Sequence, residues 1–190
     1  TVEEGTIRFA LGAIRNVGFA AMEHIVEERL ANGPFKDLYD FAERIDPRDV
    51  NKRTFENLAR AGAFDSLDPD RARVFGAAEI LVSMAQHAAE QRESAQASLF
   101  GGGDADSALE RPVIPGREPW IATQRLDGEL AAIGFYLSGH PLDDLSEQLT
   151  QRGVVFFADA PARVADGATA LRLAGVVRRR QERVSNKNGE

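Results

Sequence analysis

The chain has 190 residues, of which 43% are hydrophobic and 28% are charged, and its formal net charge is −7. This composition is typical of a globular protein with one or two small cores, and no apolar run is long enough to span a membrane. The absence of cysteine excludes disulfides and thiolate metal sites, and together with an acidic N-terminus that is unlike a signal peptide it predicts a cytoplasmic location.

Residues 1–93 are predicted to form a helical domain with short connections. Apolar residues recur at helical spacing from Phe19 to Leu30, and Gly33 ends that helix. Shorter helices are expected over residues 37–45 and 52–60, with Gly62 just beyond the second, where a helix end favours glycine. A long helix is expected to begin at Asp68 and the proline after it.

The segment from Leu11 to Gly18, followed by the helix from Phe19, has the pattern of a helix-hairpin-helix: a helix, a tight turn and a second helix. The turn of that motif offers backbone N–H groups at a helix N-terminus to a DNA phosphate. We therefore predict contacts with the DNA backbone at four residues: Arg15, Asn16, Val17 and Gly18. The motif usually has glycine at the Asn16 position, and asparagine tolerates the positive φ that the turn needs.

A weaker copy of this pattern surrounds Gly62 and Ala63, which are predicted to form a second DNA contact, as expected for two hairpins packed as a pair. An ordinary αα-hairpin that does not bind DNA remains the alternative, because a single turn containing glycine is a weak signal.

Residues 94–119 are rich in serine, glycine, aspartate and proline and are predicted to be a linker. Gln96, Ser98, Leu99 and Phe100 lie within it. Burying the last two side chains would contribute roughly 1.5–3 kcal/mol each, which predicts a peptide that docks into a pocket on a partner. The pattern resembles the sliding-clamp-binding motif of bacterial replication and repair proteins, although Ala97 replaces the usual first leucine and predicts a looser contact. An accidental match in a polar linker is the alternative.

Residues 120–152 are predicted to be a helical connector, and from residue 153 the pattern changes to β, with strands expected over residues 154–157 and 170–177. Residues 171–190 carry six basic and two acidic side chains, a local charge of +4, which leaves −11 on the rest of the chain. The net charge argues against holding nucleic acid by bulk electrostatics. Phosphate contacts should therefore concentrate at this end or use backbone groups elsewhere.

No catalytic or metal-binding residue is predicted in this chain. His24, His87 and His140 are far apart in the sequence and no cysteine completes a ligand set. Asp143 and Asp144 follow a proline at a helix start, where acidic residues favour the helix dipole.

Three segments together resemble the C-family replicative DNA polymerases, the bacterial DNA polymerase III alpha subunits: residues 7–18, 61–65 and 133–142. The resemblance implies a mainly α fold: a tandem helix-hairpin-helix domain, the clamp-binding motif, a helical connector, and the start of a truncated OB-fold over residues 153–190. The chain starts without methionine and ends within a predicted strand turn, so we expect a fragment.

The resemblance also implies a function. The full-length protein would be a DNA-directed DNA polymerase, whose palm domain holds two divalent metal ions, Mg²⁺, for nucleotidyl transfer. This fragment has no such acidic cluster and is expected to be inactive alone, with no cofactor. Its expected partners are the duplex DNA backbone, the sliding clamp and other replisome subunits. Arg178, Arg179 and Arg180 are expected to meet single-stranded template on the OB-fold.

Three rival interpretations stay open. A DNA-repair scaffold with helix-hairpin-helix motifs predicts strong, salt-sensitive duplex binding. An error-prone C-family polymerase usually differs in the last segment and lacks a good clamp motif. A pure protein-interaction module predicts clamp binding, and no change in DNA binding when Asn16 or Gly18 is altered.

Overall fold

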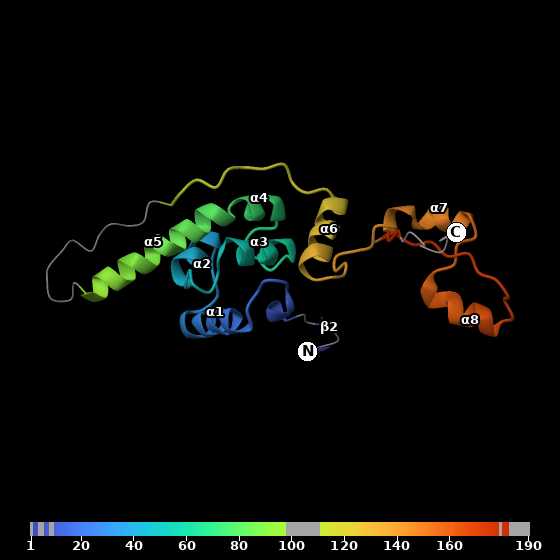
Figure 1. Cartoon of the computed structure of the whole chain (residues 1–190), viewed down its shortest axis with the longest axis horizontal. Helices are drawn as coiled ribbons and strands as arrows, with labels where there is room; N and C mark the ends of the chain where they lie inside the picture. Colours follow the sequence, from blue (N-terminus) through green and yellow to red (C-terminus); the bar gives the residue numbers. More distant parts are fainter. Residues whose placement is uncertain (1, 4–5, 8–9, 98–110, 179, 183–190) are drawn as a thin grey trace, which may run out of the picture. The chain divides into compact units, whose positions relative to one another are not determined.

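The structure is a computed structural model, and it describes residues 2–3, 6–7, 10–97, 111–178 and 180–182 (Figure 1). The chain divides into two compact units, Thr1–Ser138 and Gly139–Glu190. Within the described ranges, no helix is both long enough and apolar enough to cross a lipid bilayer.

The described chain is mainly helical, as predicted. In the first unit the elements are β1 (Val2–Glu3), β2 (Thr6–Ile7), η1 (Leu11–Ala13), α1 (Phe19–Asn32), α2 (Leu38–Arg44), α3 (Lys52–Arg60), α4 (Arg71–Gly76), α5 (Ala78–Ala97) and α6 (Ala122–Ala132). In the second unit they are η3 (Asp143–Leu145), α7 (Ser146–Gln151), η4 (Phe157–Asp159) and α8 (Ala160–Ala165). The short strands β1 and β2 pair in antiparallel fashion, with Val2 opposite Ile7, and were not predicted.

Side-chain caps explain where two of the predicted helices begin. The Asp37 carboxylate accepts the Asp40 N–H at 2.7 Å at the start of α2, and the Asn51 side chain accepts the Thr54 N–H at 3.0 Å at the start of α3. Such caps satisfy N–H groups that have no partner within the helix. Gly62 follows α3 with a φ of 78°, which confirms its predicted place.

The long helix predicted from Asp68 is instead two helices, α4 and α5, and it begins later. Asp68 accepts the Asp70 N–H at 2.9 Å and pairs with Arg73, so its carboxylate does not cap the helix. Asp70 is the N-cap and accepts the N–H groups of Ala72 and Arg73. The element before the first turn is also shorter than predicted: it is the single 3₁₀ turn η1.

The core of the first unit lies between α2, α3, α4 and α5, and α2 packs along α5 (Figure 1). Its centre is aromatic: the Phe55 and Phe64 rings stack at 4.6 Å, and Phe41 meets Phe64 edge-on at 5.1 Å. Helix α1 buries Met22, but Phe19 and Leu30, which belong to the same predicted apolar series, are largely exposed.

Residues 111–120, which we call the strap, have no regular secondary structure but are held against the first unit. Arg111 pairs with Asp37 at 3.2 Å, and the Tyr39 hydroxyl donates to the Pro112 carbonyl at 2.9 Å. Ile114 packs on the core. Figure 1 shows this segment in yellow above the helices, leading to α6. The latter part of the predicted linker is therefore anchored.

The strands predicted over residues 154–157 and 170–177 are not formed as strands in the described chain. A single parallel bridge joins Val154 and Arg172, and the Val155 N–H donates to the Arg172 carbonyl at 2.9 Å. Phe157 begins η4 instead. An alternating apolar pattern indicates a strand only where a neighbouring strand pairs along its length.

Candidate nucleic-acid interface

The predicted hairpin turn lies between η1 and α1. Asn16 has a φ of 60°, as the sequence led us to expect for this position. Ile14 and Val17 are buried and fix the turn on the core, whereas Arg15, Asn16 and Gly18 are exposed. Gly18 is the N-cap of α1, and no side chain caps the helix there. The first N–H groups of α1 therefore have no side-chain acceptor, which is the arrangement that suits an anion.

Two other helices hold this turn. The Thr54 hydroxyl of α3 donates to the Asn16 carbonyl at 3.1 Å. The Arg15 N–H donates to the Ala132 carbonyl at 2.9 Å, and its guanidinium donates to the Ala131 carbonyl at 3.1 Å. These carbonyls lie at the C-terminus of α6, where the helix dipole favours a cation. The turn is thus fixed by elements 38 and 116 residues away in the sequence.

A concavity of about 470 Å³ opens beside the turn. Four of its lining residues are basic and one is acidic; the full lining is Arg15, Asn16, Lys52, Arg53, Glu56, Asn57, Arg60 and Ala131. Such a locally basic surface suits a polyanion, although the net charge of the whole chain is negative. Of this set, only Arg15 and Asn16 were predicted from the sequence to contact DNA.

The basic side chains of the concavity differ in how they are held. Lys52 pairs with Glu79 at 2.7 Å, and this hydrogen bond raises the pKa of Lys52. Arg60 donates to the Asn57 side chain at 3.3 Å and lies over the Phe75 ring at 4.6 Å. Arg53 is exposed at the start of α3. Two consecutive basic residues, Lys52 and Arg53, follow the Asn51 helix cap. This basic pair is the sequence signal that could have pointed to the surface.

The second predicted turn has a different geometry, because it lies at the C-terminus of α3. The Gly62 N–H donates to the Ala59 carbonyl at 3.1 Å and the Ala63 N–H donates to the Leu58 carbonyl at 3.0 Å, which is the bonding of a helix C-cap. Both donors are used within the chain. We therefore leave Gly62 and Ala63 out of the candidate interface.

The remaining predicted sites lie partly outside the described chain. Gln96 falls at the end of α5, and Ser98, Leu99 and Phe100 lie outside the described residues. Arg179 also lies outside them; Arg178 and Arg180 are exposed in the second unit. Among the described residues, no three His, Cys, Asp or Glu side chains are grouped to hold a metal ion.

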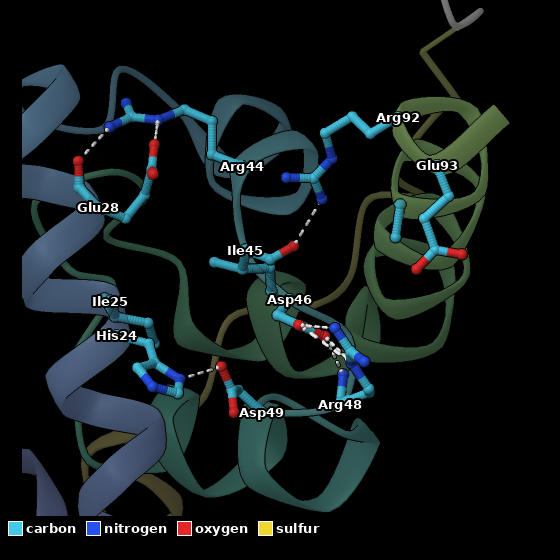
Figure 2. A pocket seen from close by; sticks show the side chains of 11 residues that line it. His24, Ile25, Glu28, Arg44, Ile45, Asp46, Arg48, Asp49, Arg92 and Glu93 are labelled. Atoms are coloured by element: carbon cyan, nitrogen blue, oxygen red, sulfur yellow. Dashed lines mark hydrogen bonds and ion pairs between the residues drawn. The ribbon is translucent and has the colours of Figure 1, made fainter. Parts of the chain in front are cut away.

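A second pocket of about 380 Å³ lies between α1, the α2–α3 connection and the end of α5. Figure 2 shows three pairs among the side chains that line it: Arg44 with Glu28, Arg48 with Asp46, and His24 with Asp49. The hydrogen bond from Arg44 lowers the pKa of Glu28, and that from Arg48 lowers the pKa of Asp46. The Arg92 guanidinium donates to the Ile45 carbonyl at 3.1 Å. These pairs satisfy one another, so we assign this pocket a structural role.

Comparison with known proteins supports a nucleic-acid interface. A family described as "Helix-hairpin-helix motif" matches residues 1–74. DNA polymerase III subunit alpha of Caulobacter vibrioides is 51% identical over 189 residues, covering 100% of this chain and 16% of the relative. The subunits of Campylobacter jejuni and Vibrio cholerae are 40% and 39% identical over 143 and 150 residues, covering 75% and 78% of this chain and 12% and 13% of those relatives.

Proposed function

The chain belongs to the DNA polymerase III alpha subunit family, of whose Caulobacter member it spans 16%, and we propose that it is a non-catalytic part of a replicative DNA-directed DNA polymerase. Its proposed task is to hold the backbone of duplex DNA and to tether the polymerase to a sliding clamp. The observation that supports DNA contact is the basic concavity beside an exposed hairpin turn.

The proposed contact uses two kinds of group. The uncapped N–H groups at the start of α1 would bind one phosphate, helped by the helix dipole. Arg15, Arg53 and Arg60 would neutralise neighbouring phosphates along the concavity. Neither kind of group reads base edges, so binding would be independent of sequence. Such contact suits an enzyme that must follow a duplex of any sequence.

Charge reversal tests the DNA contact. Arg53→Glu should weaken binding of a short DNA duplex by the 190-residue chain at least about tenfold at low salt. The matched control is Arg48→Glu. Arg48 is exposed, as Arg53 is, but it lies at the second pocket and pairs with Asp46. Equal affinities for the two variants would contradict the proposal.

The clamp tether rests on the sequence pattern of residues 96–100. Docking Leu99 and Phe100 into a clamp pocket would make each rebinding of the polymerase intramolecular and raise its effective concentration, which gives processivity. Replacing both residues with alanine should abolish binding to a purified sliding clamp, whereas Val113→Ala, an exposed change on the strap, should not. Unchanged clamp affinity in the double variant would contradict the tether.

Further proposals concern the second unit and the rest of the subunit. The two Mg²⁺ ions of nucleotidyl transfer would be held by acidic residues of a palm domain elsewhere in the subunit. The second unit would begin an OB-fold whose arginines, Arg178 to Arg180, face single-stranded template. The bridge between Val154 and Arg172 is the feature that supports a β continuation there. We also propose a cytoplasmic location and contacts with other replisome subunits, because the relatives are subunits of DNA polymerase III.

A further inference from the structure

Glu129 is a fully buried carboxylate on α6. One oxygen accepts the Arg71 guanidinium at 2.9 Å. The other accepts the backbone N–H groups of Leu137 and Ser138 at 2.7 and 2.8 Å. A buried charge is stable only when it is paired and hydrogen-bonded in this way. Glu129 therefore ties the segment after α6 to α4.

Arg71 extends the same connection to α3. Besides Glu129, its guanidinium binds the Asp65 carboxylate, with a shortest distance of 2.6 Å, and reaches the Arg60 carbonyl at 3.4 Å. It also lies directly over Gly62, where any Cβ would overlap it. A single guanidinium, whose side chain is 11% exposed, thus joins the end of α3, the following turn and α6.

Both walls of the basic concavity depend on these joined elements. Arg60, whose carbonyl Arg71 approaches, supplies one wall. Ala131, two residues beyond Glu129, supplies the other, and the next carbonyl along α6 holds the Arg15 N–H of the hairpin turn. The position of α6 therefore sets the position of the turn relative to α3.

We propose that Arg71 and Glu129 are positioning residues for the DNA-backbone interface, and this inference rests on the proposed function. Neither residue lines the concavity. Their pair holds α6 so that the turn and the basic side chains of α3 meet one phosphate backbone together. This role also accounts for Gly62, which admits the Arg71 guanidinium.

The role predicts an unusual combination of effects. Removing a positioning group lowers duplex affinity but removes no phosphate contact, so the slope of log K against log salt stays the same. Removing a contact residue lowers the slope by about 0.9 per contact. Glu129→Gln should lose about tenfold in affinity with an unchanged slope, and the Arg15 amide hydrogen should exchange faster because its bond to Ala132 loosens.

The experiment measures duplex affinity of the 190-residue chain across a salt series, with exchange of the Arg15 amide. The matched control for lost stability is Leu81→Ala, a buried core change on α5 that does not line the concavity. Arg71→Lys, which keeps the charge, is the second variant in case Glu129→Gln does not fold. All variants are compared under conditions in which circular dichroism shows that they are folded.

The expected result is reduced affinity, unchanged slope and faster Arg15 exchange for the Glu129 or Arg71 variant, whereas Leu81→Ala keeps the affinity, the slope and the Arg15 exchange rate of the unchanged protein. Behaviour equal to that of Leu81→Ala, or a reduced slope, would overturn the inference. Arg53→Ala is included as the test of the proposed function itself. If its affinity and slope match the unchanged protein, the DNA contact fails; if they fall while the Glu129 variant behaves as Leu81→Ala, only the positioning role fails.

Discussion

At the scale of single residues, the most consequential side chain is Glu129. Burial alone raises the pKa of its carboxyl, but the N–H groups of Ser138 and Leu137 and the Arg71 guanidinium outweigh burial and hold that pKa below its ordinary value of 4.5. A lowered folded-state pKa contributes stability that is present above the unfolded-state pKa and is lost as the pH falls through the folded-state pKa. The pair therefore stabilises the first unit at neutral pH and not in acid.

We predict that Glu129→Gln lowers the free energy of unfolding by about 3 kcal/mol at neutral pH, because it leaves the buried Arg71 without one partner. The difference from the unchanged protein should shrink as the pH falls below 4.5 and through the lowered folded-state pKa of Glu129. Urea unfolding followed by fluorescence of Trp120 measures both the loss of stability and its pH dependence. The Trp120 and Phe75 ring centroids lie 5.5 Å apart in the first unit. A difference that stays constant with pH would contradict the assignment.

Gly62 gives a second prediction at this scale. Gly33 also has a positive φ, of 83°, but has nothing within 4 Å of an added Cβ. Gly33→Ala should cost about 2 kcal/mol of stability from backbone strain. Gly62→Ala should cost about 2 kcal/mol more, because it also displaces Arg71. Unfolding measurements that give equal costs for both variants would show that the Arg71 contact is unimportant.

At the scale of elements, the anchoring of the strap is the feature that the amino-acid composition did not predict. Three prolines and no periodicity indicate a linker, yet Ile114 packs on the core and Arg117 lies against Gly76. Such anchors join residues far apart in the sequence, 73 residues in the case of Tyr39 and Pro112, and no local pattern encodes them. Local caps, by contrast, placed α2 and α3 correctly. The start of α4 was misplaced at Asp68 because two aspartates compete as caps, and only packing shows that Asp68 is taken by Arg73.

We predict that Ile114→Ala releases the strap. Amide hydrogens over residues 111–119 should then exchange at least about tenfold faster, because Ile114 is the strap's contact with the core. The neighbouring change Val113→Ala is the control, since Val113 is 87% exposed. Hydrogen exchange read by mass spectrometry distinguishes the two variants. Similar exchange in both would mean that Arg111 and Tyr39 suffice to hold the strap.

At the scale of the whole molecule, the two units differ in how completely they bury apolar surface. The first unit has an aromatic core, whereas no side chain is buried among the described residues from 139 onward, and Phe156, Phe157 and Leu173 are exposed. The β pattern there was recognised in the sequence, but a strand needs partners to pair with. The basic concavity was missed for a related reason: its arginines come from the turn and from both ends of α3, and only the fold brings them together.

The central claim is that the concavity beside the hairpin turn holds the backbone of duplex DNA. The most direct measurement is the salt dependence of duplex binding for the double variant Arg53→Ala with Arg60→Ala, beside Arg48→Ala from the paired pocket of Figure 2. The slope of log K against log salt should fall by about 2 in the double variant and stay unchanged in the control. Equal slopes in the two variants would contradict the account.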